Sequence, residues 1–252
     1  MNDKLIEAVG ISHAFGAVEV LSDIDLTIRR GEIVAIVGPS GCGKTTLLHL
    51  LSGHIAPTAG RIERHGSVRT VYQKDGLFPW LTVAENIALG LRHVADDTQR
   101  RSQLDEALKL VGLVEFADFY PHHLSGGMRQ RTELARALMS RAETLLMDEP
   151  FSALDYLTRL HLRHELVRLL HRMPRTVVLV THDIEEAAQL ADRVILLSRR
   201  PSRVWKTLNI QATRPRRVTQ HEVTQAVSEL LGVLNLDHAG EMPVDAEPET
   251  AT

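Results

Sequence analysis

Short apolar runs alternate with amphipathic stretches along most of this chain. The runs have the length and the β-branched or leucine content of buried strands, and they are Ile33–Val37, Val68–Tyr72, Thr144–Met147, Thr176–Val180 and Val194–Leu197. The amphipathic stretches predict helices, at Lys44–Ser52, Thr98–Val111, Gly127–Ser140, Asp155–Arg172 and Ile184–Ala191. Because this alternation is typical of βαβ units, we predict an α/β fold built around a parallel sheet.

Two regions depart from the alternation. The stretch Leu5–Arg30 reads as half-exposed antiparallel strands, since polar and apolar residues follow each other in turn. Residues 85–140 are helical without a convincing strand, which predicts an inserted helical lobe. We therefore expect one domain over residues 1–236, with a C-terminal helix within 213–236. The acidic tail at 237–252 has the composition of a disordered segment.

Composition excludes several classes of protein. A formal net charge of −3 gives no overall field that would recruit nucleic acid, so any anion must be bound by a local device. The single cysteine, Cys42, permits no disulfide within the chain and favours a reducing compartment. The longest apolar run, Ile33–Val37, is far shorter than a membrane helix, and the N-terminus does not read as a signal peptide. We expect a soluble chain that serves a membrane only as a peripheral partner.

A glycine-rich loop follows the first predicted parallel strand. It matches the pattern G-x-x-x-x-G-K-[ST] with Gly38, Pro39, Ser40, Gly41, Cys42, Gly43, Lys44 and Thr45. Glycines let backbone N–H groups surround phosphates, and the helix that begins at Lys44 adds the positive end of its dipole. We predict that these residues and Thr46 bind a nucleotide, that Lys44 reaches the β- and γ-phosphates, and that Thr45 ligates Mg²⁺.

Two alternatives apply to this loop. A glycine-rich turn with a surface lysine would also fit the pattern, but the position between a buried strand and a helix argues against it. Cys42 is interpreted as a small residue tolerated in the loop. The alternative is a redox-sensitive thiol whose pKa is lowered by the helix terminus.

Motifs farther along the chain resemble those of the ABC ATPases. The run Leu124-Ser125-Gly126-Gly127-Met128 is similar to the LSGGQ signature of that family. The remaining matches are Thr144–Glu149 for the Walker B strand, Ser152–Asp155 for the D-loop, Gln73 for the Q-loop, His182 for the switch histidine and Phe15 for the aromatic that stacks on adenine. The resemblance covers about residues 5–210. It implies a RecA-like P-loop NTPase core with an N-terminal antiparallel β-lobe and an inserted helical subdomain.

Physical chemistry supports the roles that the resemblance implies. Asp148 ends a predicted strand, where its carboxylate can hold Mg²⁺ or a water on it, and Glu149 can act as general base on the attacking water. His182 follows another parallel strand and is expected at the same sheet edge, facing the γ-phosphate. The resemblance adds Gln73 as a metal ligand and nucleotide contact and Asp155 as a nucleotide contact. An acidic strand end and a structural histidine are the alternatives.

The signature motif also implies a second subunit. Residues Ser125, Gly126 and Gly127 are predicted to begin a helix whose free N–H groups bind an anion, which is compatible with an ordinary N-cap. In the family this site binds the γ-phosphate of ATP held by the other subunit, so the resemblance implies a head-to-tail homodimer with two ATP molecules. This sequence departs from the family at Met128, usually Gln, and in the short segment Arg61–Tyr72.

The segment after Gln73 indicates a membrane partner. By resemblance, Phe78, Pro79 and Trp80 line a groove that receives a cytoplasmic helix of an integral-membrane permease subunit, and such residues are enriched in binding hot spots. Packing beneath the helical lobe is the alternative for the two aromatic rings. The Pro-Trp pair and the segment Ser198–Val204 resemble the importer group for nitrate, sulfonates and taurine. We interpret the arginines of that segment as a solvated loop, not a nucleic-acid site.

We therefore expect a Mg²⁺-dependent ATPase at the cytoplasmic face of the cell membrane that drives an importer of a small anion and meets a solute-binding protein only indirectly. An exporter subunit remains an alternative. So does a soluble ABC protein of translation or DNA repair, although those usually carry two ATPase domains or a coiled-coil insertion. A nucleotide-dependent regulator, a GTPase and a small-molecule kinase fit the motifs less well, and no N-K-x-D guanine motif is present.

Overall fold

The computed structural model describes residues 3–72 and 76–234, which form two compact units. The first unit consists of the chain up to His65 and from Thr176 onward, and the second of residues 66–175. Gln73 and the predicted acidic tail lie outside the described residues. Within the described part of the chain, no helix is long and apolar enough to cross a membrane.

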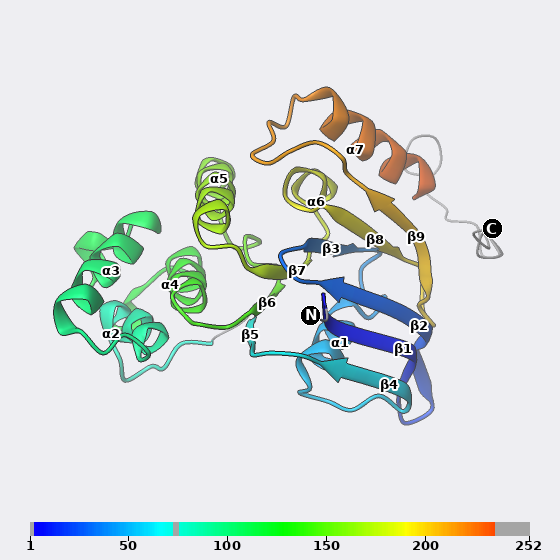
Figure 1. Cartoon of the computed structure of the whole chain (residues 1–252), viewed down its shortest axis with the longest axis horizontal. Coiled ribbons are helices and arrows are strands. Elements are labelled where there is room, and N and C mark those ends of the chain that lie inside the picture. Colours follow the sequence, from blue (N-terminus) through cyan, green and yellow to red (C-terminus); the bar gives the residue numbers. More distant parts are fainter. Residues whose placement is uncertain (1–2, 73–75, 235–252) are drawn as a thin grey trace. The chain divides into compact units, whose positions relative to one another are not determined.

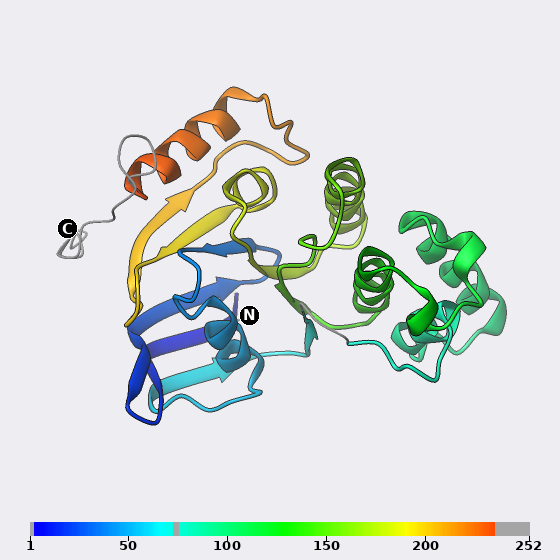
Figure 2. The ribbon, with the colours of Figure 1, turned by 180° about the vertical axis from the view of Figure 1, so that it is seen from behind.

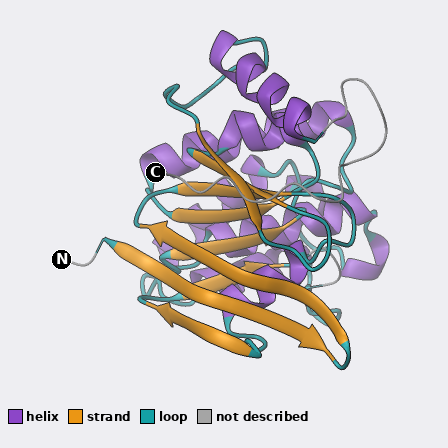
Figure 3. Ribbon diagram, turned by 90° about the vertical axis from the view of Figure 1, so that its right-hand side faces the viewer, coloured by secondary structure: helices purple, strands orange, loops and turns teal. Residues whose placement is uncertain are grey.

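An antiparallel sheet opens the first unit. Its strands are β1 (Lys4–Phe15), β2 (Val18–Arg29) and β4 (Ala59–Arg64), in the order β2-β1-β4. Figure 3 shows these strands side by side, with β4 shorter than the other two. The antiparallel pair predicted for the N-terminal stretch is confirmed. The sequence did not predict β4, whose side chains are mostly exposed and therefore carry little apolar alternation.

The second layer of strands in the first unit positions the glycine-rich loop. It contains β7 (Thr176–Val180), β3 (Ile33–Val37), β8 (Arg193–Leu197) and β9 (Val204–Asn209), in that order. Strand β3 runs parallel to both β7 and β8, and every residue of β3 and β7 is buried. In Figure 1, α6 (Ile184–Leu190) lies above β3 and α1 (Lys44–Ser52) below it. The carboxyl ends of β3 and β7 therefore share one sheet edge.

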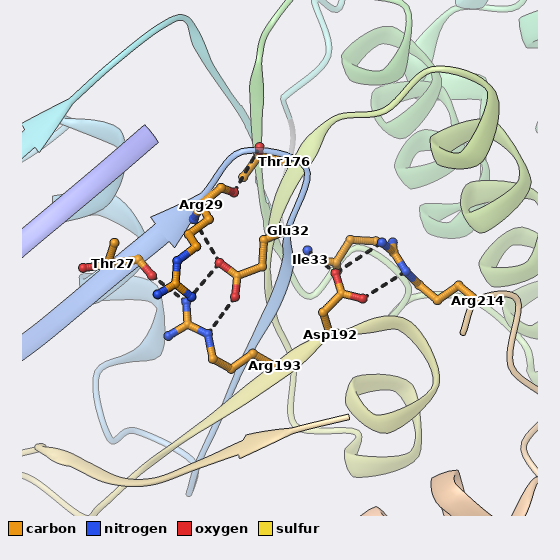
Figure 4. Close-up of polar contacts among 8 residues, drawn as sticks. All are labelled: Thr27, Arg29, Glu32, Ile33, Thr176, Asp192, Arg193 and Arg214. Carbon is orange, nitrogen blue, oxygen red and sulfur yellow. Dashed lines mark hydrogen bonds and ion pairs between the residues drawn. The ribbon is translucent and has the colours of Figure 1, made fainter. Parts of the chain in front are cut away.

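Charged side chains tie the beginning of β3 to β8 (Figure 4). The Asp192 carboxylate accepts a hydrogen bond from the Ile33 amide at 2.9 Å and pairs with Arg214 at 3.2 Å. Glu32, the residue directly before Ile33, pairs through its carboxylate with Arg193 at 2.7 Å. Side chains on both sides of the first peptide of β3 thus fix where this strand, and the loop at its far end, begin.

The C-terminal segment of the first unit braces α6. Helix α7 (His221–Val233), which falls where the sequence predicted a C-terminal helix, packs against α6. Ahead of it, the buried Arg216 guanidinium donates hydrogen bonds to the carbonyls of Ala191, Ile210 and Ala212. Burial lowers the pKa of Arg216 below its ordinary value.

The second unit is mainly helical. Its two strands, β5 (Val68–Val71) and β6 (Thr144–Asp148), are parallel. Its helices are α2 (Val83–Ala88), α3 (Asp97–Leu110), α4 (Gly126–Leu138) and α5 (Tyr156–Arg172), with 3-10 turns at Leu89–Leu91, Val114–Phe116 and Pro121–His123. Figures 1 and 2 show α4 between α5 on one side and α2 and α3 on the other. The predicted helices are present with ends shifted by at most two residues.

Candidate nucleotide site

The glycine-rich loop joins β3 to α1 in the first unit. Gly43, directly before α1, has a left-handed φ of 108°, and a Cβ there would lie 2.7 Å from a methyl of Val20, so only glycine fits. The Lys44 ammonium is turned back into the loop, donating to the carbonyls of Gly38 at 2.8 Å and Pro39 at 2.9 Å. The loop is thus closed around a nearly buried cation at a helix N-terminus, which is the arrangement that a phosphate needs.

Side chains from the segment 198–203 hold the outer side of this loop. The Arg200 guanidinium donates to the Gly41 carbonyl at 2.5 Å, and the fully buried Ser202 hydroxyl donates to the Cys42 carbonyl. The interpretation of this segment as a solvated loop is therefore incomplete: its arginines are exposed, but one of them is bonded to the loop. The sequence carried no signal for a contact between residues 159 positions apart.

Cys42 is packed inside the loop rather than offered to solvent. It is 2% exposed, and burial raises the pKa of its thiol above the ordinary value, outweighing the nearby Lys44 charge. The alternative of a thiol activated by a lowered pKa is wrong for this structure. The residue fills space as a small apolar side chain.

His182 follows β7 at the sheet edge from which the loop departs. The Thr181 amide donates to the Ile36 carbonyl of β3 at 3.2 Å, so the chain leaves β7 beside the start of the loop. The His182 side chain is exposed, and Asp183 caps α6 by accepting from the Glu186 amide at 2.9 Å. The first unit therefore brings Lys44 and His182 to the same edge.

In the second unit, β6 ends at Asp148, and Glu149 is the next residue. Asp148 is 4% exposed, and Glu149 has a left-handed φ of 47°, which costs about 1 kcal/mol or more for a side chain with a Cβ. Three hydrogen bonds hold the Glu149 carbonyl in this conformation. They come from the Gln130 amide at 2.8 Å, the Ser152 hydroxyl at 3.0 Å and the Ser152 N–H at 3.2 Å.

Gln130, in α4, connects this helix to the chain after β6. Its side-chain oxygen accepts from the Ala153 amide at 3.1 Å while its nitrogen donates to Glu149, so one buried amide spans both backbone positions. The sequence analysis missed Gln130. A polar residue on the buried face of a predicted amphipathic helix was the available signal, because such a group must find partners.

The predicted signature residues begin α4. The Ser125 hydroxyl accepts from the Met128 amide at 3.2 Å, as an N-cap does, and Gly126 and Gly127 form the first turn. A Cβ on Gly127 would lie 3.1 Å from the Ala153 carbonyl, so this turn lies close against the D-loop.

Asp155 lies at the start of the next helix. It caps α5 by accepting from the Thr158 amide at 3.0 Å, and hydrogen bonds from Thr158 lower the pKa of this carboxyl. The D-loop carboxylate therefore stays ionised over a wider acidic range than an ordinary aspartate.

The two aromatic residues after Gln73 are presented by a polar scaffold. Phe78 is 40% and Trp80 68% exposed, with ring centroids 5.4 Å apart, and Pro79 between them is also exposed. The buried Asn86 side chain accepts from the Phe78 amide at 2.9 Å and donates to the Leu81 carbonyl at 3.0 Å. The alternative that both rings pack beneath the helical lobe is therefore wrong for Trp80.

The same scaffold includes a cation from α4. The Arg136 guanidinium lies 5.6 Å from the Phe78 ring centroid and also donates to the Gly76 carbonyl. Phe78 thus lies near the Arg136 guanidinium and the Trp80 ring and still keeps 40% of its surface exposed. In the first unit, Phe15 ends β1 with a 56% exposed ring, edge-on to His13 at 4.7 Å.

The donor sets fit ATP and Mg²⁺. In the first unit, an ammonium, a helix N-terminus and glycine backbone suit a polyphosphate, and the Thr45 hydroxyl is an oxygen donor of the kind that Mg²⁺ prefers. In the second unit, the Asp148 carboxylate is another oxygen donor of this kind. Among the described residues there is no group of three or more His, Cys, Asp or Glu side chains that would hold a metal by themselves.

Comparison with known proteins decides the family. The ABC transporter family matches residues 21–152, which contain the glycine-rich loop, the signature and the end of β6. This chain belongs to the ABC transporter family. It is an ABC ATPase, and its P-loop NTPase fold confirms the expected fold class.

Several relatives of this ABC ATPase are named for import. The aliphatic sulfonates import ATP-binding protein SsuB 1 of Rhodococcus jostii (strain RHA1) is 43% identical over 93% of this chain and 95% of that protein. The nitrate import ATP-binding protein NrtC of Synechococcus elongatus is 44% identical over 78% of this chain but only 32% of its own length. Among solved structures, the dimeric structure of the ABC transporter cassette MJ0796 has a TM-score of 0.74 and 31% identity, covering 83% of this chain and 100% of that one.

Proposed function

We propose that this ABC ATPase powers an importer of a small anion, with two copies clamping two ATP molecules and driving separate membrane subunits. The relatives named for sulfonate and nitrate import support the importer class. The observation that carries the coupling to a membrane partner is the exposed aromatic pair Phe78 and Trp80 on a buried polar scaffold. The chain would lie at the cytoplasmic face of the membrane as a peripheral subunit.

Nucleotide binding is assigned to the loop of the first unit. Lys44 and the backbone of Gly38 to Gly43 would hold the phosphates, Thr46 would add a contact in the first turn of α1, and Phe15 would stack on adenine. Bound Mg²⁺ would supply charge neutralisation at the β- and γ-phosphates, with Thr45, Asp148 and Gln73 as its protein ligands.

Hydrolysis is assigned to Glu149 as the base that polarises the attacking water. Its fixed backbone supports this role, because three hydrogen bonds on its carbonyl limit where the carboxylate can reach. His182 would contact the γ-phosphate from the sheet edge that also carries the loop.

The second subunit completes each site in this proposal. The N-terminus of α4 at Ser125, Gly126 and Gly127 would contact the γ-phosphate bound by the partner, and Asp155 would lie near the same nucleotide. The dimer of the similar MJ0796 cassette supports a two-fold assembly of this kind.

The first experiment tests the clamp and the base together. Glu149→Gln should bind Mg·ATP and accumulate as a dimer on size-exclusion chromatography, with ATP turnover reduced by roughly a thousandfold. Lys44→Ala should remain monomeric under the same conditions, because it loses nucleotide affinity. Normal turnover by Glu149→Gln would remove Glu149 from the role of base.

The second experiment tests the partner. Co-expression with its cognate permease subunits should yield a complex that takes up a sulfonate or nitrate in proteoliposomes at the expense of ATP. Trp80→Ala should weaken that complex. Met173→Ala, which removes another exposed apolar side chain of the same unit, should not. Export of the solute instead of uptake would identify an exporter and overturn the proposed direction.

A further inference from the structure

The carbonyl groups of the glycine-rich loop are held by donors from several parts of the first unit. Lys44 bonds to the carbonyls of Gly38 and Pro39, and the Leu47 amide to that of Gly43. The carbonyls of Gly41 and Cys42, at the centre of the loop, are held by Arg200 and Ser202. Only these last two donors are side chains from outside the loop and its helix.

The segment that supplies these donors is itself fixed. The Ser198 amide donates to the Arg203 carbonyl at 3.1 Å, which closes the segment into a tight loop. Ser202 is joined to β2 through its own backbone, since its amide donates to Val20 at 2.9 Å and its carbonyl accepts from Ser22 at 3.0 Å. Arg200 therefore projects from a rigid support toward Gly41.

In an anion-binding loop, each peptide group has its N–H on one side and its carbonyl on the other. A donor that fixes a carbonyl therefore also fixes the N–H of the next residue. The Gly41 carbonyl belongs to the same peptide as the Cys42 N–H, and the Cys42 carbonyl to the same peptide as the Gly43 N–H. Holding both carbonyls fixes the orientation of two successive peptides. The Cys42 N–H donates to the Pro39 carbonyl at 3.3 Å, which closes the turn that these peptides form.

We propose that Arg200 is a positioning residue for nucleotide binding, which fixes the Gly41–Cys42 peptide and thereby the turn of the loop that would surround the phosphates. The role rests on the proposed phosphate site at Lys44 and adds a residue outside the glycine-rich loop, the signature, the Walker B strand and the D-loop. Arg200 acts through the loop carbonyl and does not itself touch the nucleotide. Because loop N–H groups of this kind contact the α- and β-phosphates, ADP and ATP should be affected equally.

Arg199 provides a matched control. It is the neighbouring residue, carries the same charge and is exposed, and in the described part of the chain its side chain makes no hydrogen bond or ion pair. Arg199→Ala removes one positive charge from the same segment without touching the Gly41 carbonyl. The pair of variants therefore separates the effect of geometry from that of net charge.

The experiment measures ADP and ATP affinity of the purified full chain by calorimetry. Arg200→Ala should raise both dissociation constants about three- to tenfold, as expected for loss of one charge-assisted hydrogen bond at a partly exposed site. Arg200→Lys should restore part of the affinity, and Arg199→Ala should change it less than about twofold. The difference between Arg200→Ala and Arg199→Ala should persist in 300 mM NaCl, because an effect of net charge alone would be screened at this salt concentration.

A spectroscopic readout distinguishes positioning from a general loss of structure. The amide resonances of Gly41, Cys42 and Gly43 should move in Arg200→Ala and stay in place in Arg199→Ala, while the thermal midpoint without nucleotide changes by less than about 2 °C. If Arg200→Ala and Arg199→Ala lost affinity equally, the effect of Arg200 would be one of net charge only, and the proposal would be wrong.

Lys44→Ala separates this inference from the proposed site. If Lys44→Ala loses nucleotide affinity while Arg200→Ala binds normally, the phosphate site stands and the role of Arg200 is wrong. If Lys44→Ala binds ADP and ATP unchanged, the phosphate site itself is misplaced and the proposal for Arg200 falls with it.

Discussion

The side-chain amide of Gln130 donates a hydrogen bond to the backbone carbonyl of Glu149 at 2.8 Å. Gln130 lies one turn after the start of α4, and Glu149 follows the buried end of β6. The proposed base is therefore oriented through its backbone by the helix that begins with the signature residues. This link gives α4 a part in hydrolysis that its N-terminus alone does not suggest.

Replacing Gln130 with methionine keeps the length of the side chain and removes both hydrogen bonds. We expect kcat for ATP hydrolysis to fall about tenfold with little change in KM, because the base loses one of the groups that position it. The free energy of unfolding should fall by about 2 kcal/mol, since the Ala153 amide loses its partner. Gln99→Met, at an exposed position of α3, is the control for steady-state kinetics and urea denaturation. An unchanged kcat would contradict the link.

The left-handed backbone of Glu149 predicts an unusual order of stability. Glu149→Gly and Glu149→Ala both remove the carboxylate, but the glycine variant should be more stable by about 1 kcal/mol, because alanine retains the strained conformation. At Glu106, an exposed residue within α3, the order should reverse by about 1 kcal/mol. Urea denaturation of the four variants measures both differences. If the alanine variant were the more stable one at both positions, Glu149 would not be strained in solution.

The motifs and the main elements could be predicted from sequence because their signals are local. The loop at Lys44 and the buried strand Ile33–Val37 are contiguous in the chain, and the observed β3 and α1 have the predicted ends. The contacts of Arg200 with Gly41 and of Gln130 with Glu149 join distant parts of the chain, so no local pattern reports them. The conformation of Glu149 was hidden for another reason: glutamate rarely adopts a positive φ.

Glu133 predicts a pH-dependent contribution to stability. Burial raises the pKa of this carboxyl above its ordinary value of 4.5, although the amides of Tyr72 and Gly76 donate to it and Arg136 lies 3.7 Å away. The folded state therefore holds a proton that the unfolded state releases, and this contribution to stability is lost as the pH rises from about 4.5 through the raised pKa.

Glu133→Gln should remove that pH dependence. The difference in free energy of unfolding between the parent chain and Glu133→Gln should move in favour of the variant as the pH rises through this window, and then level off. Urea titrations at closely spaced pH values measure it. A difference that moved in favour of the parent chain would mean that the pairing with Arg136 outweighs the cost of burial.

Arg216 predicts a large loss of stability at a site remote from the motifs. Arg216→Met leaves the carbonyls of Ala191, Ile210 and Ala212 without this donor, and we expect a loss of about 3 kcal/mol in the free energy of unfolding. Arg217→Met, at the next and exposed position, should cost less than about 0.5 kcal/mol. A similar small loss in both variants would show that these carbonyls find water when the guanidinium is removed.

Helix α4 carries Ser125 at its first turn, Gln130 against the Glu149 backbone and, near its last turn, Arg136 against the carbonyl of Gly76. A helix of this length is stiff, so its contacts move as one rod. A small tilt of α4 would therefore change three places together: the proposed phosphate contact at Ser125, the proposed base Glu149 and the aromatic pair Phe78 and Trp80.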